Sequence, residues 1–167
     1  GGIQLKGEVL CTVLRKVVNA ASTEETRPYL NGVYFEIASQ EITTVATDGK
    51  RLMKASQAIE NTIEKQLTGI IPVKSVKTIV SMFDSDSVVT INLLESQLVI
   101  SGEGVVFITR LIEGEYPDYN AVITPVKDND KVLTIDKASL VSVVRRTSLL
   151  GNPKTPSVAF QLAEGVL

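Results

Sequence analysis

Hydrophobic residues recur every three or four positions between residues 7 and 21, which places them along one side of a predicted helix. The flanking segments alternate hydrophobic and polar positions, as half-buried strands do. These predicted strands cover residues 3–5, 32–39, 41–47 and 51–59. Turns are expected at Ser39-Gln40 and at Asp48-Gly49, and the second is a strong signal for a two-residue hairpin.

The same order of elements returns further along the chain, which indicates an internal repeat. A strand at 69–73 and a helix at 74–83 are followed by strands at 88–93, 98–101 and 105–111. A third copy opens with a strand at 132–135, an N-cap at Asp136 and a helix at 137–150, and a further strand run is expected over 157–162. In that helix Leu140, Val141, Val144 and Thr147 are expected to face inward.

This pattern predicts an α+β fold of repeated β-α-β-β-β units, with helices on one face of antiparallel sheets. Two units form a first domain over residues 1–117, residues 118–130 form a linker, and residues 131–167 are the truncated start of another domain. The last piece is not expected to fold well alone, because a small sheet needs three or more strands or a packing partner.

The amino-acid composition excludes several kinds of catalytic and metal site. The 167 residues are 44% hydrophobic and 22% charged, with a net charge of −2, which is typical of a globular protein. The absence of histidine excludes Ser-His-Asp triads and HExxH zinc sites, and the single Cys11 excludes an internal disulfide. We expect no cofactor and no metal. No hydrophobic run approaches the ~20 residues of a membrane span, so we expect no membrane partner. With one free cysteine and no targeting segment, we expect a cytoplasmic protein.

The charges are distributed unevenly between the predicted elements. The helices are mainly basic, while the rest of the chain is acidic. The basic residues singled out are Arg15 and Lys16 on the first helix, Lys74 and Lys77 on the second, and Arg145 and Arg146 on the third. One interpretation is that these are solvated helix faces. The other is a shared surface for a polyanion, where Lys and Arg would contact phosphates without reading bases.

Three motifs resemble the bacterial DNA polymerase III β subunit family, the sliding clamps. They are TRPYLNGVYFE at residues 26–36, VATDGKRL at 45–52 and FITRLIEGEYPDY at 107–119. The resemblance covers the middle domain of such a clamp and the start of its third domain. Since the chain begins with Gly1 and not with Met, we expect it to be a piece of a longer protein.

The resemblance implies a non-catalytic processivity factor. Full-length clamps of this family form a head-to-tail homodimeric ring whose helices surround duplex DNA without sequence preference. The resemblance adds Arg27 and Tyr29 to the residues expected to face DNA. Without the remaining domains, the 167-residue chain is expected to be a monomer.

A pocket for partner peptides is also implied by the resemblance. In this pocket the replicative DNA polymerase catalytic subunit and the clamp loader would dock. Carried over by position, its residues are Leu30, Thr47, Gly49, Lys50, Arg51, Leu52, Pro117 and Val122, and its other wall is expected beyond Leu167.

Two other classes of function remain open. A carboxylate-based enzyme would need converging acidic residues, and the sequence indicates none. A protein-interaction adaptor that does not bind DNA would be built on the same repeats, but it predicts acidic or mixed helix faces.

Overall fold

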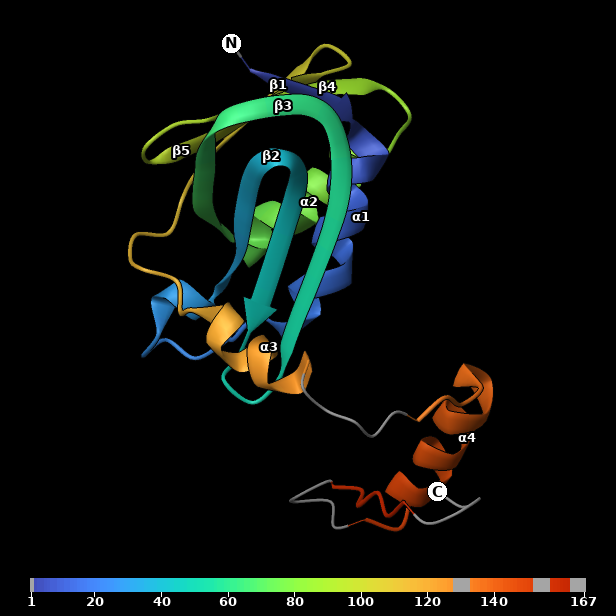
Figure 1. Ribbon diagram of the computed structural model, residues 1–167. Helices are drawn as coiled ribbons and strands as arrows, with labels where there is room; N and C mark the ends of the chain where they lie inside the picture. The colour runs from blue at the N-terminus through green and yellow to red at the C-terminus, as the bar shows by residue number, and fades with distance from the viewer. Residues whose placement is uncertain (1, 128–132, 152–156, 163–167) are drawn as a thin grey trace. The chain divides into compact units, whose positions relative to one another are not determined.

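The computed structural model describes residues 2–127, 133–151 and 157–162, and the chain divides into two compact units, Gly1–Tyr119 and Asn120–Leu167. The first unit contains the repeats (Figure 1). Its elements are β1 (Ile3–Lys6), α1 (Gly7–Val17), the 3₁₀ turns η1 (Val18–Ala20) and η2 (Pro28–Leu30), β2 (Gly32–Thr47), β3 (Leu52–Pro72), α2 (Val73–Phe83), β4 (Val88–Leu93), β5 (Gln97–Gly102) and β6 (Val105–Arg110). The expected α+β class with antiparallel sheets is confirmed.

Two long strands replace the four short ones that the alternation predicts. β2 doubles back on itself and β3 wraps around it on the outside (Figure 1). The reversal in β2 lies at the expected turn, where Ser39 has a φ of 52° and the pairing register shifts. The predicted strands 51–59 and 69–73 are joined within β3, because the backbone between them continues to pair with β2. A hairpin forms at Asp48-Gly49 as expected, but its loop has four residues, 48–51, and not two, since Thr47 pairs with Leu52 across it.

The two repeats exchange their first strands. β1, the first strand of repeat one, pairs with β4 of repeat two, with Ile3 opposite Ile91. The end of β3, which opens repeat two, pairs in turn with the start of β2, with Gly32 opposite Pro72. Each repeat therefore completes the sheet of the other, and both are needed to form the unit.

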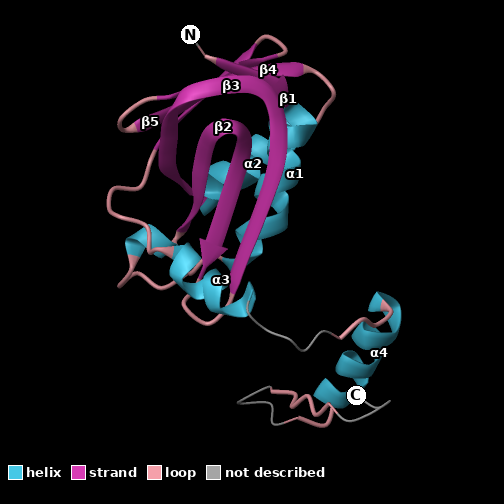
Figure 2. Cartoon of the chain, viewed as in Figure 1, coloured by secondary structure: helices cyan, strands magenta, loops and turns pink. Residues whose placement is uncertain are grey.

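The helices α1 and α2 lie on the same side of the sheet formed by β2 and β3 (Figure 2). The first backbone N–H groups of α1, at Gly7 and Glu8, donate to the carbonyls of Ser87 and Ser85 at 2.9 and 2.8 Å. These bonds satisfy donors that a helix leaves free at its start. A Cβ at Gly7 would lie 2.0 Å from the carbonyl oxygen of Phe83, so only glycine fits this close approach.

The hydrophobic core lies within the first unit. The predicted helical stripe is buried there: Leu10, Leu14 and Val17 have no exposed surface. They pack in one cluster with inward-facing strand residues such as Phe35 and Ile91. Both repeats therefore contribute to one hydrophobic core.

The second unit differs from the sequence-based expectation. The expected linker contains α3 (Tyr119–Lys127). Of the two prolines in the expected linker, Pro117 precedes this helix, while Pro125 lies within it and removes one backbone N–H donor. The helix α4 (Lys137–Ser148) is confirmed, and the carboxylate of its N-cap Asp136 accepts a hydrogen bond from the Ser139 N–H at 2.8 Å.

The strands expected in the second unit do not form within its described residues. Residues 133–135 and 157–162 are irregular, while Val132 falls outside the described part. The expected inward positions Leu140, Val141, Val144 and Thr147 are also wrong, because no residue of α4 is buried. The physical reason is the same for both: strands and apolar helix faces need partners, and the described residues of this unit supply none.

Candidate binding surfaces

The turn between β2 and β3 is held by side-chain bonds to its own backbone. One carboxylate oxygen of Asp48 accepts from the N–H groups of Lys50 and Arg51, at 2.9 and 3.0 Å. These backbone donors favour the charged carboxylate and hold the pKa of Asp48 below its usual value. The Thr47 hydroxyl donates to the Arg51 carbonyl at 2.6 Å and accepts from the Gly49 N–H at 3.0 Å. The turn is therefore a preorganised structure.

Arg27 packs against this turn from a neighbouring loop. Gly49 has a φ of +87°, and a Cβ there would lie 3.0 Å from one guanidinium nitrogen of Arg27. The guanidinium also forms an ion pair with Glu24, with 2.8 Å between nitrogen and oxygen. Sequence reasoning assigned Arg27 to DNA, and the structure places its side chain beside the candidate peptide site. The DNA contact of Arg27 stays a prediction.

The Arg51 side chain links the turn to the end of the first helical segment. Its Nε donates to Asp48 at 3.2 Å, and a terminal nitrogen donates to the backbone carbonyl of Asn19 at 2.8 Å. The side chain remains 65% exposed, so its charge is accessible while its position is fixed. Sequence reasoning missed Asn19, because a backbone carbonyl acceptor leaves no signature in the residue type.

The residues proposed for the peptide pocket differ in how accessible they are. Five of them lie on or beside the turn, namely Thr47, Gly49, Lys50, Arg51 and Leu52. Leu30 is close to the turn through Ser22, which donates to the Leu30 carbonyl and lines a hollow of about 170 Å³ with Asp48 and Arg51. The Leu30 side chain, however, is only 3% exposed.

The remaining two pocket residues lie after β6. Pro117 is exposed and follows Tyr116, whose hydroxyl donates to the Val45 carbonyl at 3.5 Å. Burial raises the pKa of Tyr116 to about 12. Val122 is 61% exposed on α3, in the second unit. The structure thus places Pro117 close to β2. Val122 belongs to the second unit, which is described separately.

The basic residues of α1 and α2 are exposed, but they are not equivalent. Arg15 forms an ion pair with Asp84 at the end of α2, so part of its charge is compensated. Sequence reasoning missed this pair, because its members are 69 positions apart. Lys16, Lys74 and Lys77 form no ion pair within the described part of the chain.

A hollow of about 560 Å³ lies between the turn at residues 47–52 and the basic residues of α2. It is lined by Lys74 and Lys77 of α2, by Arg51 of the turn and by the segment around Ser22. Arg51 therefore borders both the candidate peptide site and the basic helix surface, which the sequence treated as separate. This hollow concentrates positive charge and suits a phosphate-bearing ligand.

Other expected residues stand apart from these surfaces. Tyr29 is partly buried in η2, and Arg145 and Arg146 are exposed in the last turn of α4. Among the residues that the structure describes, no group of His, Cys, Asp or Glu could hold a metal ion. In the same part of the chain, no helix has the length and apolarity needed to span a membrane.

Two repeats that exchange strands, with a pair of basic helices on one face of the sheet, define a DNA-clamp-type domain. Residues 4–118 match the family model described as the DNA polymerase III beta subunit, central domain. The "Beta sliding clamp" of Chlamydia pneumoniae is 33% identical over 98% of this chain and 44% of its own length. That of Bacillus subtilis is 30% identical over 96% and 45%.

The comparison with solved structures agrees. A crystal structure of the DNA polymerase sliding clamp from Bacillus subtilis matches with a TM-score of 0.82 and 28% identity, over 93% of this chain and 40% of that one. The chain belongs to the DNA polymerase III β subunit family, and it spans less than half the length of these relatives.

Proposed function

We propose that the chain is part of a sliding clamp, a non-catalytic processivity factor. The full-length protein would encircle duplex DNA as a head-to-tail ring of two copies and tether the replicative DNA polymerase. The observation that carries this proposal is a set of lysines on helices that pack together on one face of the sheets. These are Lys16, Lys74 and Lys77, and none of them forms an ion pair with another described residue. The clamp loader would be a second partner, the setting would be the cytoplasm, and the 167-residue chain alone would stay monomeric.

The number of charges argues for holding DNA by enclosure and not by tight binding. Each phosphate that a protein neutralises contributes about −0.9 to the slope of log K against log salt. A few lysines therefore give weak, salt-sensitive attraction, and an enclosing ring supplies the retention. An adaptor that does not bind DNA would be indifferent to these charges.

The first test reverses charge on α2 in the full-length protein. Lys74→Glu with Lys77→Glu should reduce clamp loading or processive synthesis at least fivefold, because the helix face would then repel phosphates. Templates of different sequence should lose activity by the same factor. The control is Lys65→Glu, an exposed lysine on β3, which is compared with Lys74→Glu and Lys77→Glu as single variants of equal charge change. Equal loss in the control, or loss on some templates only, contradicts sequence-independent contact through α2.

We further propose that the turn at residues 47–52, with Leu30 and Pro117, forms one wall of a peptide-binding pocket. The supporting observation is the preorganised turn, which offers Lys50 and Arg51 as cations beside the partly buried Leu52. An extended peptide with one or two apolar anchors suits this mixture.

The test of this pocket is Leu52→Asp in the full-length protein. Burying a leucine-sized anchor contributes about 1.5–3 kcal/mol, so a charge at that wall should weaken a polymerase-derived peptide at least tenfold in fluorescence anisotropy. Met53→Asp is the control, because successive strand residues point to opposite faces and Met53 is already 44% exposed. Unchanged affinity for Leu52→Asp would move the partner site elsewhere. Both variants should still load on DNA.

A further inference from the structure

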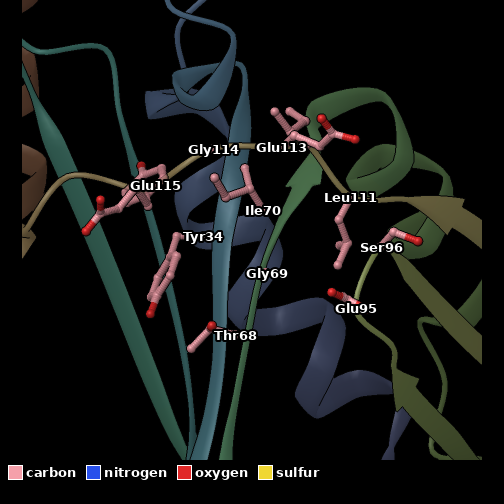
Figure 3. Close-up of a pocket in the computed structure, with 12 residues that line it drawn as sticks. Tyr34, Thr68, Gly69, Ile70, Glu95, Ser96, Leu111, Glu113, Gly114 and Glu115 are labelled. Carbon is pink, nitrogen blue, oxygen red and sulfur yellow. The ribbon is translucent and has the colours of Figure 1, made fainter.

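A separate groove of about 600 Å³ lies on the first unit and shares no residue with the turn or with the basic hollow. Its walls come from β2, the end of β3, the β4–β5 turn and the segment that follows β6 (Figure 3). The N–H of Ile112 donates to the Ile70 carbonyl at 2.9 Å, which fixes the segment after β6 against β3. The groove thus combines two strands with a turn and an irregular segment that is hydrogen-bonded to β3.

The middle of the groove is apolar and aromatic. The Tyr34 ring stacks on the Tyr116 ring, with centroids 5.1 Å apart and an interplanar angle of 25°. The Tyr34 hydroxyl donates to Glu36 at 3.0 Å, so the ring is held from its far end as well. Ile70 and Leu111 line the same stretch. This surface is preformed, which reduces the entropy lost on binding.

The rim of the groove is acidic. Glu95, Glu113 and Glu115 are exposed, and none of them takes part in an ion pair within the described residues. In the view of Figure 3, Glu115 lies at one end and Glu95 at the other, with Tyr34 and Leu111 between them. Among the residues that the structure describes, no lysine or arginine lines the groove.

We propose that this groove docks an extended, lysine- or arginine-rich peptide segment of a protein partner. Uncompensated carboxylates at both ends would pair with basic side chains, while the central apolar stretch would take one aliphatic side chain. The same carboxylates repel nucleic acid and acidic peptides, so this partner differs from the DNA and the pocket peptides proposed above.

The binding test uses the 167-residue chain and a fluorescein-labelled peptide, Lys-Lys-Ser-Leu-Ser-Lys-Lys. We expect saturable binding by fluorescence anisotropy at low salt. The combined variant Glu95→Gln, Glu113→Gln and Glu115→Gln should bind at least fivefold more weakly. The control Glu25→Gln, Glu60→Gln and Glu103→Gln changes the net charge equally and should stay within twofold of the unaltered chain. Equal loss in both variants, or no binding to the unaltered chain, overturns the proposal.

Three further binding measurements distinguish a docked peptide from a general attraction of polycations. Replacing the central leucine of the peptide with serine should weaken binding at least threefold, and a Glu-Glu-Ser-Leu-Ser-Glu-Glu peptide should not bind. If the serine peptide binds equally well, or if equimolar spermidine displaces the leucine peptide, the groove is not a peptide site. Leu52→Asp should leave the affinity for the leucine peptide unchanged. The outcome of this test is therefore independent of the proposed peptide pocket at the turn. Should the triple variant fail to fold, Glu95→Gln alone, expected to weaken binding at least twofold, takes its place.

Discussion

At the scale of single residues, Gly49 meets two constraints of different strength. Its φ of +87° lies in the left-handed region, which an L-residue adopts only with strain. A Cβ at residue 49 would also lie only 3.0 Å from a guanidinium nitrogen of Arg27. The second contact is with the far end of a long exposed side chain, and exposed ion pairs such as Arg27–Glu24 contribute only ~0–1 kcal/mol. Backbone strain is therefore the larger effect.

This ranking predicts the outcome of Gly49→Ala. We expect a loss of about 1–2 kcal/mol in the free energy of unfolding, measured by urea denaturation, because the strained φ remains. Gly104→Ala is the matched control, since Gly104 has a φ of +78° and open space where its Cβ would be. The two losses should agree within ~0.5 kcal/mol. A much larger loss at Gly49 would mean that the Arg27 contact stabilises the turn.

At the scale of elements, the sequence predicts the order of the repeats but not the exchange of their first strands. Asp48-Gly49 identifies its hairpin because few residues accept the backbone conformation of such a turn. The strand at 3–5 carries no comparable signal, because its alternation would suit either neighbouring sheet. The joining of 51–59 to 69–73 within β3 is equally hidden, since the backbone pairing that joins them does not depend on residue type.

The junction of α1 with α2 gives an element-scale prediction. Alanine normally stabilises a helix by about 1 kcal/mol relative to glycine. At Gly7 the added Cβ would instead meet a backbone carbonyl at 2.0 Å, and that atom cannot move without shifting the end of α2. Overpacking of this kind costs about 1–3 kcal/mol and occasionally more. We therefore expect Gly7→Ala to lower the unfolding free energy by about 3 kcal/mol in urea denaturation.

Lys16→Ala provides the control for this helix, because Lys16 is exposed on α1 and unpaired within the described residues. Its effect should remain within about 0.5 kcal/mol. If Gly7→Ala were stabilising, the close contact between the start of α1 and the Phe83 carbonyl would not exist in solution.

At the scale of the whole molecule, a net charge of −2 conceals a basic hollow and an acidic groove on the same unit. Helix periodicity was enough to predict that the basic residues of α1 and α2 lie on exposed helix faces. The pairing of Arg15 with Asp84 and the assembly of Glu95 with Glu113 and Glu115 depend on tertiary structure, so spacing along the chain could not reveal them. The turn of the candidate peptide site was predictable, but the burial of Leu30 was not.

The distribution of the core predicts how the chain behaves when it is shortened. Every hydrophobic residue found buried in the described part lies between Ile3 and Ile100, within the first unit. A chain ending at Tyr119 keeps that core, together with the packing of Tyr119 beside Tyr34 and Lys54. Because hydrophobic burial is the main source of stability, residues 1–119 should unfold at the same urea concentration as the 167-residue chain, within about 0.3 M, as followed by circular dichroism. A chain ending at residue 100 removes β6 and with it the pairing that covers β5, and it should not fold. A midpoint for residues 1–119 that falls by 1 M or more would show that the second unit contributes to the stability of the first.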